Sequence, residues 1–121
     1  MAQDRTHVTG RIDYMYDTPE QQGTKLGQET FSMTHFADGR AIQRALCRIA
    51  RPGLDVERYS VMAVDANWRP TEAFVRIETG GQFTGSAWYT FSATQAECAA
   101  DTTGEGRITY RQPLNGPFSF C

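Results

Sequence analysis

Short runs of alternating apolar and polar residues, separated by turns that contain Gly or Pro, fill almost the whole chain. The first run, 8–16, puts Val8, Ile12 and Tyr14 on one side and polar residues such as Arg11 and Asp13 on the other. A period of two is typical of a β-strand whose two faces meet different surroundings. No segment keeps a helical period over ten residues, so the pattern predicts an all-β protein.

Eight strands are predicted, over 8–16, 28–36, 41–50, 57–65, 72–78, 82–91, 97–102 and 107–112. The short links between them favour hairpins over βαβ crossovers. We therefore expect one domain over residues 1–121, an antiparallel meander closed or half closed into a barrel of about eight strands, with a two-sheet sandwich as the alternative. The ending Phe118–Cys121 is typical of a strand cut short, which leaves open whether the natural chain continues.

Two turns predict which side chains share a face. Asp38-Gly39 indicates a two-residue type I′ turn, which sets Glu29 opposite Arg48. Gly80-Gly81 indicates a second two-residue turn. These registers predict one shared face for Glu29, Phe31, Met33, His35, Ile42, Arg44, Leu46 and Arg48, and another for Phe74, Arg76, Glu78, Phe83, Ala87, Tyr89 and Phe91.

The predicted faces mix apolar rings with charges, and both sides of each hairpin are partly apolar. A barrel of about eight strands has a lumen just wide enough for side chains or one small ligand. We therefore predict a lined cavity whose ligand-binding residues are Glu29, Phe31, Met33, Phe74, Phe83 and Phe91. The plainer interpretation is that the arginines and Glu78 reach solvent near strand ends and that the lumen is filled.

The candidate catalytic residues are His35, Arg48, Arg76, Glu78 and Tyr89. An arginine, Arg48 or Arg76, would hold an anionic or carbonyl oxygen, and His35, Glu78 or Tyr89 would move a proton. His35 could equally be a partly exposed residue at the end of a hairpin.

Composition excludes several classes of function. The 121 residues carry 12 Lys and Arg against 14 Asp and Glu, so no basic excess points to nucleic acid. Two histidines without a ligand-like spacing, and the lack of phosphate- and dinucleotide-binding motifs, predict no metal and no cofactor. The sequence has no apolar leader or membrane-length run, and three cysteines without CxxC spacing indicate reduced thiols, so we expect a cytoplasmic protein without membrane contact.

The meander, the hairpin glycines and the segment 83–91 (FTGSAWYTF) resemble calycin-type, lipocalin-like β-barrels, and loosely the small bacterial barrels that act as cofactor-free cyclases, isomerases or lyases. That resemblance implies a hydrophobic small molecule in the barrel mouth. We therefore predict a cofactor-independent enzyme of isomerase, cyclase or lyase type acting on an apolar or aromatic small molecule. The alternatives are a carrier for a hydrophobic ligand and an interaction subunit, and in each case we expect a homo-oligomer.

Overall fold

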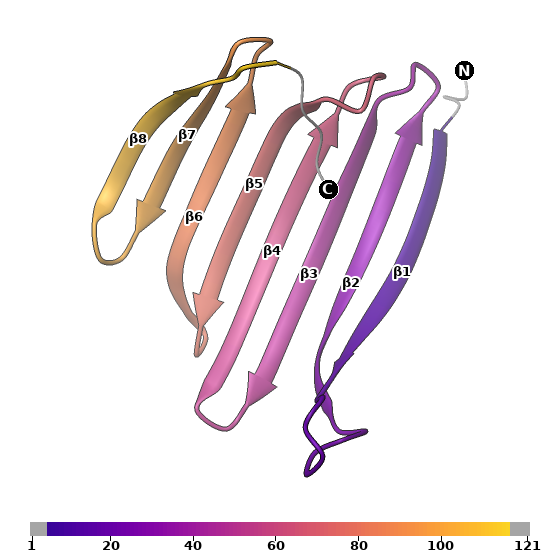
Figure 1. Cartoon of the computed structure of the whole chain (residues 1–121), viewed down its shortest axis with the longest axis vertical. Coiled ribbons are helices and arrows are strands. Elements are labelled where there is room, and N and C mark those ends of the chain that lie inside the picture. The colour runs from indigo at the N-terminus through magenta and orange to yellow at the C-terminus, as the bar shows by residue number, and fades with distance from the viewer. Residues whose placement is uncertain (1–4, 117–121) are drawn as a thin grey trace.

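The computed structural model describes residues 5–116, and all of their regular structure lies in one antiparallel sheet (Figure 1). The eight strands stand side by side in chain order, which confirms the predicted all-β meander. Their bounds are β1 Arg5–Met15, β2 Lys25–Phe36, β3 Ala41–Arg51, β4 Leu54–Val64, β5 Pro70–Thr79, β6 Gln82–Phe91, β7 Gln95–Thr102 and β8 Gly106–Pro113.

The sheet is half closed. Within the described residues β1 pairs with β2 and β8 pairs with β7, and no hydrogen bonds join the two outer strands to each other. Figure 1 shows the strands fanning out between these two edges. The arrangement therefore has one layer, in contrast to a closed barrel or a two-sheet sandwich.

The β2–β3 turn differs from the two-residue turn that was predicted. Phe36 pairs with Arg40 across a three-residue loop that ends at Gly39, whose φ of 93° favours glycine. The extra loop residue shifts the register by one, so Glu29 lies opposite Cys47, and Gln28 opposite Arg48. The predicted Glu29–Arg48 pair is therefore wrong, because a slip of one residue reverses the face of every side chain in one strand.

The β5–β6 turn has two residues, as predicted. Gly80 and Gly81 both have positive φ, and Thr79 pairs with Gln82. The register shifts immediately afterwards, between Ile77 and Glu78, and this β-bulge reverses the faces along the rest of β6. The predicted face is therefore divided: Phe74, Arg76, Glu78 and Phe83 stay together, whereas Ala87, Tyr89 and Phe91 lie on the opposite face.

Both corrections separate apolar from charged side chains. The apolar face, as the register defines it, includes Val8, Ile12, Phe31, Met33, Ala45, Cys47, Val56, Met62, Val75, Ile77, Ala87, Tyr89, Phe91, Ala96, Cys98 and Ile108. The polar face includes Arg11, Thr30, Arg44, Arg48, Glu57, Arg76, Glu78, Glu97 and Arg111, with Leu46, Tyr59, Phe74 and Trp88 among them. The predicted sharing of a face by charges and bulky apolar residues therefore holds in part: Leu46 stays with Arg44 and Arg48, whereas Phe31 and Met33 lie on the opposite face from these arginines.

Burial follows the same division. The buried hydrophobic residues all lie on the apolar face: Ala41, Ala45, Cys47, Val64 and Cys98. Yet none of the side chains in the described part of the chain has less than 2% of its surface exposed. One sheet face holds the core residues, and no second layer within residues 5–116 covers them.

Candidate ligand-binding site

A hollow of about 550 Å³ lies over the C-terminal half of the sheet. Its walls come from β5, β6, β7, β8 and the segment after β8, and include Ala73, Tyr89, Phe91, Ala96, Cys98, Tyr110, Gln112 and Leu114. Glu97 of β7 also borders the hollow, although its side chain pairs with Arg111 on the polar face. The other strand residues belong to the apolar face. Alanine at two positions and cysteine at a third leave room beside the three aromatic rings. We call this the apolar hollow.

The hydroxyl of Tyr89 supplies a polar group in the apolar hollow. Its ring stacks on that of Phe91, with centroids 6.5 Å apart and planes 14° from parallel. Burial, and then the neighbouring Cys98 thiol, raises the pKa of Tyr89 above its ordinary value. The hydroxyl therefore stays protonated at neutral pH and can donate a hydrogen bond to a bound molecule.

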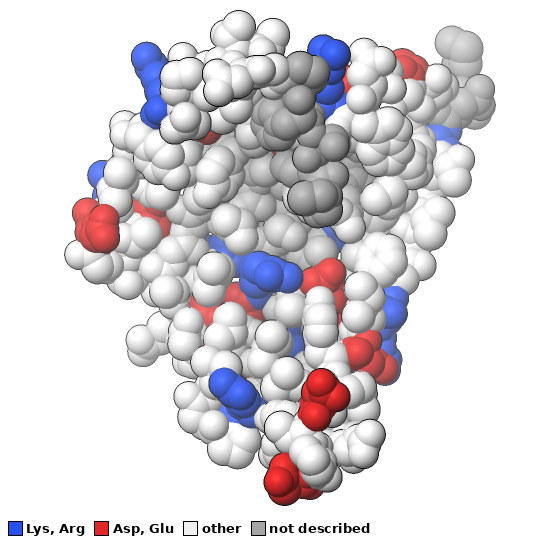
Figure 2. Space-filling view, in the orientation of Figure 1, with Lys and Arg blue, Asp and Glu red and all other residues white. Residues whose placement is uncertain are grey.

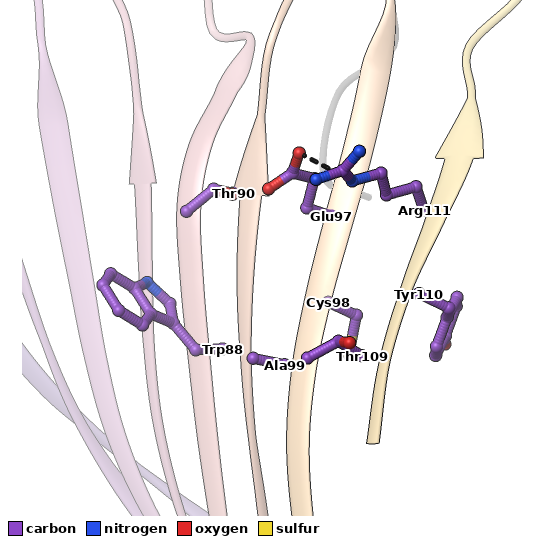
Figure 3. A pocket seen from close by; sticks show the side chains of 8 residues that line it. All are labelled: Trp88, Thr90, Glu97, Cys98, Ala99, Thr109, Tyr110 and Arg111. Carbon is purple, nitrogen blue, oxygen red and sulfur yellow. Dashed lines mark ion pairs between the residues drawn. The ribbon is translucent and has the colours of Figure 1, made fainter. Parts of the chain in front are cut away.

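A second hollow, of about 720 Å³, lies against the same strands on the polar face (Figure 3). Trp88, Thr90, Glu97 and Arg111 point to this side, whereas Cys98 and Tyr110 point to the other. Glu97 and Arg111 form an ion pair of 3.2 Å.

The indole N–H of Trp88 donates to Glu72 at 3.0 Å. The charged walls of this second hollow therefore already satisfy one another and stand in solvent, so the apolar hollow is the better candidate for a ligand.

A polar cluster crosses the apolar face over β1–β4. Arg58 donates to Glu29 Oε2 at 3.1 Å, and the Tyr14 hydroxyl donates to the same oxygen at 3.4 Å. The thiol of Cys47, between these strands, contacts the Glu29 carboxylate. Only 13% of the Glu29 side chain is exposed, so these neighbours replace the water that an ionised carboxylate requires.

The polar cluster predicts a loss of stability in alkali. Burial raises the pKa of the Cys47 thiol and of the Tyr14 hydroxyl. The unfolded chain then releases these protons at a lower pH than the folded chain, so their contribution is complete below the unfolded pKa and falls as pH rises above it, from about pH 8.5 for a thiol. Urea unfolding between pH 7.5 and 10 measures the decline.

The Cys47→Ala variant lacks the thiol and so lacks its contribution to the pH dependence of stability. The free energy of unfolding of this variant should therefore fall less steeply with rising pH than that of the wild type. Equal slopes for the two proteins would contradict the assignment.

The structure divides the predicted catalytic residues between the two faces. Tyr89 lines the apolar hollow. His35 lies on the apolar face beyond it, 5.9 Å from the Trp68 ring. Arg48 pairs with Asp55 at 3.4 Å, and Arg76 pairs with Glu78 at 3.1 Å, all on the polar face.

The predicted ligand-binding residues are divided in the same way. Phe91 lines the apolar hollow, and Glu29, Phe31 and Met33 lie on the apolar face over β2. Phe74 and Phe83 lie on the polar face, where the Arg76 guanidinium stands 4.7 Å above the Phe83 ring. Of the eleven site residues predicted from the sequence, the structure thus brings Tyr89 and Phe91 together in one hollow.

Sequence reasoning missed the small residues and the β8 tyrosine that shape the apolar hollow. Ala96, Cys98 and Ala100 alternate along β7 on the apolar face. Three small side chains in alternate positions leave space above a strand, which is the signal that could have indicated a cavity. Tyr110 lies opposite Cys98, so correct pairing of the last two strands was needed to include it.

No protein-family model, curated protein or solved structure matches the chain. In the described residues no group of three or more His, Cys, Asp or Glu side chains is placed to hold a metal ion. Residues 5–116 form no helix, hence none long and apolar enough to span a membrane. The site is thus defined by its geometry alone: an apolar hollow on one face of an open antiparallel sheet.

Proposed function

We propose that this protein binds an apolar or aromatic small molecule in the apolar hollow, the carrier alternative among the functions predicted from the sequence. The observation that supports this is the hollow of about 550 Å³ with alanine, cysteine and aromatic walls. Ligand sites are typically 300–1,000 Å³, mostly apolar, with few polar groups. Tyr89 and Gln112 line the hollow and supply such groups, and they can orient one carbonyl or hydroxyl of the ligand.

The residues that line the apolar hollow favour ligand binding over catalysis. Of the predicted catalytic residues, Tyr89 is the one that lines the hollow. Like an ordinary tyrosine it is protonated at neutral pH, and burial raises its pKa further, so its hydroxyl is a donor and not a base. Arg48, Arg76 and Glu78 are held in ion pairs on the polar face. A cofactor-independent isomerase, cyclase or lyase reaction, and membership of the calycin-like group, stay predictions.

The test is a fluorescence titration with N-phenyl-1-naphthylamine, a neutral apolar dye that brightens when it leaves water. Ala96→Phe fills the hollow, and Ala99→Phe adds the same ring to the polar face of the same strand. We expect saturable binding by the wild type and by Ala99→Phe, with affinity at least about tenfold lower for Ala96→Phe, equivalent to about 1.4 kcal/mol. Equal affinities for the two variants would show that the dye binds outside the apolar hollow, and would overturn the proposal.

A further inference from the structure

The chain exposes more surface than is usual for its size, and the β1 end of its apolar face is open to solvent. A monomeric protein of 13.6 kDa is expected to expose about 6,600 Å² of surface, whereas this chain exposes 8638 Å². The difference is about 2,000 Å². On the apolar face, Val8 is 50% and Ile12 43% exposed, at positions where a second layer would bury them.

We propose that a second copy of this chain covers the apolar face, so that two open sheets stack through their apolar faces in a twofold dimer. If the interface took up the whole excess of about 2,000 Å² on each copy, it would total about 4,000 Å², within the range of obligate homodimers. A small ligand covers only a fraction of that area. Stacked sheets lie about 10 Å apart with interdigitated side chains, which would supply the second layer that one chain lacks.

The charges on the apolar face favour a copy of itself as the partner. In the interior of this face the charged side chains that the structure describes are Glu29 and Arg58, and they already form an ion pair. A neutral face does not repel its own copy, and a twofold axis lets the same patch be used by both subunits. The polar face carries Arg44, Arg48 and Glu57 among many other charges. Stacking through that face would desolvate these charges, which is unfavourable.

This inference does not depend on the proposed ligand, but it would change the site. The apolar hollow opens on the face that the partner would cover. Stacking would therefore enclose the hollow between two sheets, and the partner would supply its missing wall.

The experiment is light scattering during size exclusion of the full chain, in a reductant so that disulfides cannot link copies. We expect a mass of about twice 13.6 kDa for the wild type. Val8→Lys with Ile12→Lys puts two charges on the apolar face, and the matched control Leu46→Lys with Tyr59→Lys puts two charges at similarly exposed positions on the polar face. Only the first pair should lower dimer affinity, by at least about tenfold, and circular dichroism verifies that both variants fold.

If the folded wild type stays monomeric at about 100 µM, a second copy does not cover the apolar face, and the proposal is overturned. A dimer that resists Val8→Lys with Ile12→Lys, or that the polar-face control disrupts equally, would also overturn it. Failure of dye binding with a normal dimer would remove the proposed ligand and leave this inference standing.

Discussion

Gly27→Ala is expected to lower the free energy of unfolding by about 3 kcal/mol, at the upper end of the usual cost of overpacking. A methyl group at Gly27 would collide with the carbonyl oxygen of Arg48 and come within 2.9 Å of the Ile49 Cα. These are backbone atoms of the neighbouring strand, and they cannot rotate away as a side chain would. The β2–β3 pairing must therefore open locally.

Gly104→Ala is the matched control, because a methyl group there meets nothing within 4 Å. Urea unfolding of both variants at one protein concentration gives the comparison, since stability depends on concentration if the chain dimerises. Gly104→Ala should lie within about 0.5 kcal/mol of the wild type. If Gly27→Ala were equally neutral, the β2–β3 register described above would be wrong.

Arg58→Ala is expected to cost about 2 kcal/mol, because it leaves a mostly buried carboxylate without its cation. Glu29 would keep the weaker hydrogen bond from Tyr14 and gain little water, with 13% of its side chain exposed. Arg58 itself is half exposed, so the cost comes mainly from Glu29.

Arg48→Ala removes the same type of side chain from an exposed ion pair with Asp55 on the polar face. Exposed pairs contribute about 0–1 kcal/mol, so this control should unfold close to the wild type in urea. Similar losses in the two variants would show that the Glu29–Arg58 pair does not stabilise the apolar face more than a surface pair does.

The fold class could be predicted from the sequence because it depends on local signals. The period of two, the hairpin turns and the short links each act over a few residues, and together they predicted eight strands in chain order. The faces could not be predicted so well, because one extra residue reverses them. The three-residue loop ending at Gly39 and the bulge after Gly81 each added that residue, and neither has a signal that distinguishes it from a plain two-residue turn.

The candidate site was less predictable for the same reason. Tyr89 and Phe91 were identified because aromatic residues are conspicuous, and they do lie in the apolar hollow. Arg76 was grouped with them, and Arg48 with Glu29, through registers that the structure corrects. The space itself is made by Ala73, Ala96 and Cys98, and small side chains form a cavity only through what surrounds them in three dimensions.

Figure 2 shows one face of the molecule, where charges of both signs lie in small mixed groups among uncharged side chains. This face therefore carries no extended patch of charge of one sign. The corrected registers matter most for the proposed ligand site, because they set the position that a molecule bound there would have relative to β7.

Methyl NMR of the protein with N-phenyl-1-naphthylamine bound tests that position most directly. Ala96 and Ala99 lie on opposite faces of β7, so their methyl groups report the two sides of the sheet independently. We expect nuclear Overhauser effects from the dye to the Ala73 and Ala96 methyls and none to Ala99. Effects to Ala99 without any to Ala96 would contradict it.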